Sequence, residues 1–214
     1  MPAKPRPHSP EDDLAFMRSI VEGGRPQLTL GVAYLAGGLL YGLQCLFHVG
    51  QSTGVIRWPD LANLAFVVLI TGSFCAVLTW AVLKDRRDGM DAARGPMAGR
   101  ALNAAFSASG MANLAVILIF GFGAARDGDF AIWLYYPAVI FALQAAAWYV
   151  AFSLKRKPWM LACSVGGWFT AVALGLLVRQ PDWYLAVCTV ALFALFALPG
   201  WIMVRDARAA RTRG

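Results

Sequence analysis

The stretch 28–49 reads LTLGVAYLAGGLLYGLQCLFHV and contains no Asp, Glu, Lys or Arg. Five further stretches share this property: 61–83, 101–123, 130–154, 158–178 and 183–204. Each of the six is 21 to 25 residues long, and a helix of that length spans a hydrocarbon layer of about 30 Å. We therefore predict an all-α membrane protein with six transmembrane helices.

The basic residues are distributed unevenly between the segments that separate these stretches. Sixteen of the 19 Lys and Arg residues lie in 1–27, 84–100, 155–157 and 205–214, and three lie in the other segments. Because Lys and Arg accumulate in cytoplasmic loops, this pattern predicts a multi-pass protein of the inner (plasma) membrane with both termini in the cytoplasm. The net charge of +7 is then a topology signal. It favours lipids with anionic headgroups as partners, and we expect no nucleic acid.

Short loops and two terminal segments define the predicted organisation. The short loops predict that the spans of the membrane domain, 28–204, form three antiparallel hairpins. The N-terminal arm, 1–27, contains Ser9 followed by Pro10 and three carboxylates, which predicts an amphipathic helix over 10–22. That helix either lies on the membrane or docks a cytoplasmic protein partner. Residues 205–214 form a basic cytoplasmic tail.

Small residues recur four apart in the odd-numbered stretches. The first contains Gly38 and Gly42, the third has ladders of Ala and Ser, and the fifth contains Gly167, Ala171 and Gly175. Such spacing lets two helix backbones approach closely in lipid. We therefore expect the odd-numbered spans to form the tight interior, or one ladder to form the interface of a homo-oligomer.

Amides are the main polar groups predicted near the membrane midplane. Gln44, Asn113 and Gln144 lie on the first, third and fourth stretches, and an amide facing lipid would lose its hydrogen bonds. They are therefore expected to point inward. Two interpretations remain open: the amides bond to one another and lock the bundle, or they line, together with Tyr41, a site for a neutral or weakly polar ligand.

Aromatic and proline residues add further candidates. Trp168 follows Gly166 and Gly167 near the middle of the fifth stretch. It either fills the space that the glycines leave or forms the wall of a ligand pocket. Pro137 and Pro199 predict local breaks in the fourth and sixth spans, and such breaks often mark a hinge or a binding site.

A metal site has only weak candidates. Cys45 and His48 share one face of the first helix, and Cys188 is expected at a similar depth. These residues could bind a soft metal, or the two thiols could pair. The only other histidine, His8, lies in the N-terminal arm, so a haem held by two histidines of one subunit is excluded. We predict no metal and no cofactor.

The function predicted from these features is transport. Sequence motifs of serine hydrolases, P-loop nucleotide-binding proteins and zinc proteases do not occur, so we predict no enzyme activity. Six closely packed spans with midplane amides favour a transporter or channel-like unit for a neutral or weakly polar small molecule. The alternative is a membrane sensor or regulatory anchor that binds a cytoplasmic partner or lipid through the N-terminal helix and the basic loops.

Overall fold

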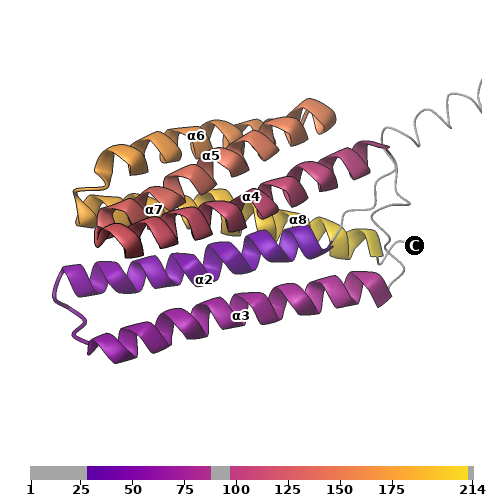
Figure 1. Cartoon of the computed structure of the whole chain (residues 1–214). Helices are drawn as coiled ribbons and strands as arrows, with labels where there is room; N and C mark the ends of the chain where they lie inside the picture. The colour runs from indigo at the N-terminus through magenta and orange to yellow at the C-terminus, as the bar shows by residue number, and fades with distance from the viewer. Residues whose placement is uncertain (1–27, 88–96, 212–214) are drawn as a thin grey trace, which may run out of the picture.

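A computed structural model describes residues 28–87 and 97–211, and every regular element in these ranges is helical (Figure 1). The first five helices are α2 (Leu28–Ser52), α3 (Asp60–Arg87), α4 (Met97–Asp127), α5 (Phe130–Lys155) and α6 (Pro158–Leu177). The last span is composite and consists of α7 (Pro181–Leu192), a π-helical turn η1 (Phe193–Ala197) and α8 (Leu198–Arg211).

Within the described ranges, six helical segments are long and apolar enough to cross a membrane, as the prediction of six transmembrane helices requires. Several helices extend beyond the predicted stretches: α3 ends at Arg87 and α4 ends at Asp127, each about one turn past the predicted end. α4 begins at Met97, about one turn before the uncharged stretch, and α8 continues through Arg211, so most of the expected tail prolongs the last helix. The predicted amphipathic helix over 10–22 lies outside the described residues.

Local sequence signals explain where the helices begin. α6 and α7 each start with a proline, Pro158 and Pro181, whose fixed φ suits the first helical position. Asp129 caps α5 by accepting a hydrogen bond from the backbone N–H of Ala131 at 2.9 Å. Gly128 precedes it with a φ of +67°, a conformation that glycine adopts without steric cost. These signals keep the turns between successive spans short.

The first turn of α2 is bound by a carboxylate of α3. Asp85 is buried, and its Oδ2 accepts hydrogen bonds from the backbone N–H of Thr29 at 2.8 Å and from the Thr29 hydroxyl at 2.5 Å. A carboxylate at this place satisfies a free N–H group and faces the positive end of the helix dipole. The contact therefore joins the start of α2 to the end of α3.

Helix α2 lies between α3 and the composite last span. It packs against α3 on one side and against α7, η1 and α8 on the other, whereas α5 packs against both α4 and α6. Figure 1 shows the starts of α2 and α4 and the ends of α3 and α8 at the same end of the bundle. Most successive spans are neighbours, but α3 and α4 are not in close contact, whereas α2 packs against α8 of the last span. The grouping into three hairpins and the cytoplasmic side both stay predictions.

The prediction that the odd-numbered spans form the interior is wrong for the third span. In its apolar window only 11% of residues are buried, the same share as in α3, against 28% to 39% in the other four spans. A Cβ at Gly110 of α4 or at Gly175 of α6 would meet no atom within 4 Å. Small residues four apart occur wherever alanine and glycine are frequent, so spacing alone does not identify a packed face.

The closest backbone contact joins α2 to the last span. A Cβ added at Gly38 would overlap the backbone N of Ala197 and lie 2.7 Å from its Cα. From the opposite side, a Cβ at Gly200 would overlap the backbone N of Leu35. A Cβ added at Gly42 would lie 3.0 Å from the ring of Phe193. The predicted close approach at Gly38 and Gly42 is thus present, with the sixth span as the partner.

The π-helical turn η1 precedes Pro199. The backbone N–H of Leu198 bonds to the carbonyl of Phe193, five residues earlier. Since Pro199 has no N–H, it cannot continue the α-helical pattern, and the helix absorbs an extra residue per turn at this place. The predicted break at Pro199 is therefore present, whereas α5 continues without interruption through Pro137.

Candidate functional site

A tyrosine and an amide are joined inside the bundle. The hydroxyl of Tyr34, on α2, donates a short hydrogen bond to Oε1 of Gln144, on α5. Both side chains are buried. The ring of Tyr34 is enclosed by aromatic rings of three other helical segments, with centroid distances of 5.6 Å to Phe106, 5.2 Å to Trp148 and 5.1 Å to Phe196. This cluster links α2, α4, α5 and η1.

Tyr34 was not among the residues predicted for the site. It lies seven residues before Tyr41 on α2, and residues seven apart lie on nearly the same face of a helix. That periodicity is the signal that could have identified Tyr34. It was missed because Tyr34 is closer to the end of the span, where a tyrosine commonly serves as an interfacial anchor.

Four polar side-chain atoms are buried without a hydrogen-bond partner in the described part of the chain. They are Oε1 of Gln44, Oγ of Ser109, Oδ1 of Asn113 and Nε1 of Trp148. Two belong to amides that the sequence placed in the site. Each buried donor or acceptor without a partner costs about 1–3 kcal/mol. Polar atoms without partners are thus found inside the bundle on three of its helices.

These four atoms lie at successive depths. Phe106 packs beside both Tyr34 and Trp148, which sets the level of α4 relative to α2 and α5. Ser109 and Asn113 follow Phe106 by three and seven residues, and Gln44 follows Tyr34 by ten. At 1.5 Å per residue, the unsatisfied atoms are distributed over about 15 Å of the membrane depth.

The three predicted amides do not form a mutual network. Gln144 bonds to Tyr34 instead, and the carbonyl oxygens of Gln44 and Asn113 have no partner among the described residues. The interpretation in which the amides lock the bundle by bonding to each other is therefore wrong. Tyr41, the fourth predicted residue, packs against Phe74 of α3 at a centroid distance of 5.5 Å.

Trp168 lies on the outside of the bundle. Its side chain is 42% exposed and contacts the ring of Tyr149 at a centroid distance of 5.8 Å. The space beside Gly166 is filled by Leu195, and the space beside Gly167 is filled by Ala145. The expectation that Trp168 fills this space is wrong, because residues of other helices occupy it.

The three weak metal candidates do not converge. The Sγ atoms of Cys45 and Cys188 lie 3.8 Å apart. Nδ1 of His48 instead lies 2.8 Å from Oε1 of Gln51. Nε2 of Gln51 donates a hydrogen bond to Oδ1 of Asn63 at 2.7 Å. Within 28–87 and 97–211, no three His, Cys, Asp or Glu side chains form a group that could hold a metal ion. His48 therefore belongs to a polar chain between α2 and α3.

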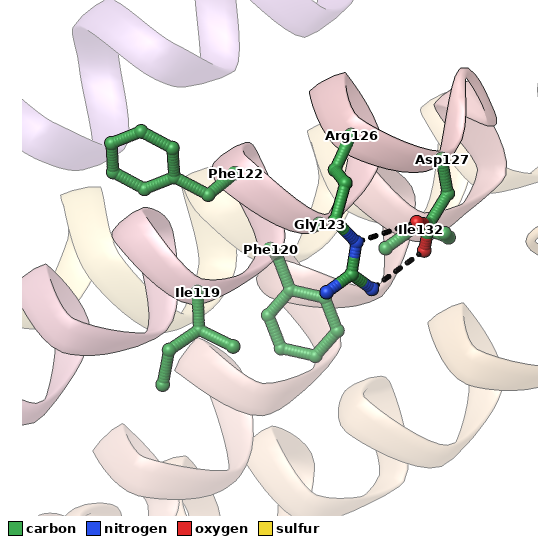
Figure 2. Close-up of a pocket in the computed structure, with 7 residues that line it drawn as sticks. All are labelled: Ile119, Phe120, Phe122, Gly123, Arg126, Asp127 and Ile132. Atoms are coloured by element: carbon green, nitrogen blue, oxygen red, sulfur yellow. Dashed lines mark hydrogen bonds and ion pairs between the residues drawn. The ribbon is translucent and has the colours of Figure 1, made fainter.

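A hollow of about 460 Å³ lies where α4 leads into α5 (Figure 2). Its lining consists of Ile119, Phe120, Phe122, Gly123, Arg126, Asp127 and Ile132. Figure 2 shows Arg126 paired with Asp127, and the two hydrogen bonds measure 2.7 and 3.0 Å. Both charged side chains are exposed. None of the residues predicted for the ligand site lines this hollow, so it is a separate feature of the surface.

Comparison of the chain with protein-family models, with curated proteins and with solved structures found no match.

Proposed function

We propose that this polytopic membrane protein is a transporter or channel-like unit for a small neutral molecule. Its path follows the polar seam, the name we give to Gln44 of α2, Ser109 and Asn113 of α4, and Trp148 of α5. The observation that carries the proposal is that these four residues bury polar atoms without partners. A molecule that enters the seam would supply the missing hydrogen bonds.

The chemistry of the four atoms defines the class of solute. Three are oxygen atoms that accept hydrogen bonds, and one is an indole N–H that donates. None of the four side chains is ionisable, and a charge in the membrane interior is stabilised chiefly by an opposite charge or by many dipoles. The seam therefore suits a neutral solute rich in donors, such as a small polyol or an amide.

The packing of α4 supports an opening movement. The four polar atoms are enclosed by protein, as expected for a closed form of the proposed path. α4 packs mainly against α5 and contacts α2 through the rings of Phe106 and Tyr34. It is also one of the two least buried spans. A small displacement of α4 from α2 would expose the polar atoms and separate few apolar contacts.

Flux into proteoliposomes tests this function. Purified protein should raise the entry of glycerol or urea above that of protein-free liposomes in stopped-flow light scattering. Asn113→Leu should reduce this added flux by about tenfold or more, since an apolar side chain of similar volume removes the acceptor. If the wild-type protein adds no flux of either solute, the proposal fails.

The matched control lies on the same helix. Ser107 is exposed on the outer side of α4, whereas Asn113 is partly buried. Ser107→Leu should leave flux unchanged, because it alters only the lipid-facing surface. An equal loss of flux in Ser107→Leu and Asn113→Leu would contradict a path along the polar seam.

The alternative of a sensor or regulatory anchor depends on the N-terminal arm, 1–27, which lies outside the described residues. No contact among the described residues favours it. Placement in the plasma membrane, with both termini in the cytoplasm, likewise belongs to the proposal and is supported by the distribution of Lys and Arg.

A further inference from the structure

Two thiols that are far apart in the sequence meet inside the bundle. Cys45 of α2 and Cys188 of α7 are separated by 143 residues, and their Sγ atoms lie 3.8 Å apart. Cys188 is buried and Cys45 is partly buried. The other two cysteines of the chain, Cys75 and Cys163, are also free thiols. The structure therefore holds one close thiol pair and two further cysteines that serve as internal controls.

The helices around the thiol pair are held in place by other contacts. A Cβ added at Gly42, three residues before Cys45, would lie 3.0 Å from the ring of Phe193. Tyr184, one turn before Cys188, donates a hydrogen bond from its hydroxyl to the carbonyl of Leu134 at 2.8 Å. The two sulfur atoms are thus kept close by packing on both sides. A disulfide needs them to approach to about 2.05 Å, which requires side-chain rotation and a small helix shift.

The depth of the pair restricts the oxidant that can reach it. Cys45 lies seven residues before the end of α2 at Ser52, and Cys188 lies seven residues after the start of α7 at Pro181. At 1.5 Å per residue, both thiols are about 10 Å from the helix ends. This depth lies within the hydrocarbon layer, where a lipid-soluble quinone partitions and a charged oxidant does not.

We propose that Cys45 and Cys188 form a redox-modification site that closes to a disulfide between the first and the sixth span. Two S–H bonds break and one S–S bond forms. The two electrons and two protons pass to a membrane quinone, which becomes a hydroquinone. The bond covalently joins α2 to α7 on the side of α2 that already packs against the last span. This proposal is independent of the proposed transport function.

Thiol counting tests the site. The protein is reconstituted in lipid nanodiscs, reduced, treated with a short-chain ubiquinone analogue, and then denatured and alkylated for mass spectrometry. Two of the four thiols should become resistant to alkylation, and the peptides containing Cys45 and Cys188 should be linked. Cys75 and Cys163 should remain fully alkylated. Four alkylatable thiols after quinone treatment, or a link through Cys75 or Cys163, would overturn the proposal.

Thermal unfolding provides the second readout. Closing a long loop with a disulfide restricts the unfolded chain, so oxidation should raise the Tm of the wild-type protein by about 5 to 10 °C. Cys188→Ala should show no rise, whereas Cys163→Ala should show the full rise. An equal rise in Cys188→Ala would show that the quinone acts elsewhere and would contradict the assignment. Cys45→Ala provides a second variant in which the rise must also disappear.

Discussion

The two sides of α2 differ in how they are packed. Toward the last span, Gly38 and Gly200 bring the backbones into direct contact, and Phe193 covers Gly42. We call this region the sealed seam. Toward α4 and α5, Tyr34 bonds to Gln144, and α4 and α5 carry three of the four unpartnered polar atoms of the polar seam, in Ser109, Asn113 and Trp148. The closest backbone contact of the bundle and most of its unpartnered polar atoms therefore lie in different regions.

The difference separates what stabilises the bundle from what is available for function. In lipid, helices associate through close packing and hydrogen bonds because burial of apolar surface between them brings no hydrophobic gain. The sealed seam has such packing along much of its length. Several polar atoms of the polar seam lack hydrogen bonds, and this arrangement does not stabilise the bundle. We expect a substitution that disturbs the sealed seam to lower stability, and one that removes an unpartnered polar atom from the polar seam to raise it.

The largest effect is expected in the sealed seam. Gly38→Ala places a Cβ against the backbone of Ala197, so the helices must separate, and we expect a loss of about 3 kcal/mol or more of unfolding free energy. Gly72→Ala is the control, because its Cβ meets no atom within 4 Å and alanine favours a helix. Denaturant unfolding in mixed micelles measures both variants. Equal stability of the two would contradict the sealed seam.

An intermediate effect is expected at Tyr34, whose hydroxyl forms the buried hydrogen bond with Gln144. Tyr34→Phe removes the donor to Gln144 and leaves the amide oxygen buried without its partner. We expect a loss of about 1 kcal/mol, the scale of interhelical hydrogen bonds in membranes. Tyr149→Phe serves as the control because Tyr149 is 48% exposed. The same unfolding assay applies, and a loss in Tyr149→Phe as large as in Tyr34→Phe would argue against a special role for the pair.

The smallest effect is expected to have the opposite sign. Asn113→Leu replaces a buried carbonyl that has no partner with an apolar group of similar volume, so stability should rise by about 0.5–1 kcal/mol. Ser107→Leu, on the exposed side of the same helix, should change stability by less. A clear destabilisation by Asn113→Leu would mean that Asn113 stabilises the folded bundle, and the contrast between the seams would then be lost.

The number of candidate spans was predictable because charge is excluded from long stretches of this chain, whereas several helices extend by a turn or more beyond those stretches. The position of Gly38 in a close contact was also predictable from its spacing to Gly42. Its partner was not, since a stripe of small residues does not specify which helix fits against it. Gly175 has the same spacing, and the structure leaves it open.

The candidate site was only partly predictable. The free-energy cost of burying an amide without a hydrogen-bond partner correctly directed attention to Gln44, Asn113 and Gln144. It could not show that Gln144 bonds to Tyr34 while the side-chain carbonyls of Gln44 and Asn113 have no partner. Trp168 was misplaced because sequence gives depth along a helix and not direction around it. His48 was grouped with Cys45 by spacing, although Gln51, also three residues away, is its partner.

Water access to the polar seam tests the central claim most directly, because it requires no knowledge of the solute. In a variant with all four cysteines replaced by alanine, Asn113→Cys is compared with Ala115→Cys, an exposed position on the same helix. A small charged methanethiosulfonate reacts with thiolates, which form in water and not in lipid. We predict that position 113 in proteoliposomes reacts at least about tenfold faster than position 115. Equal, negligible rates at the two positions would contradict a path along the polar seam.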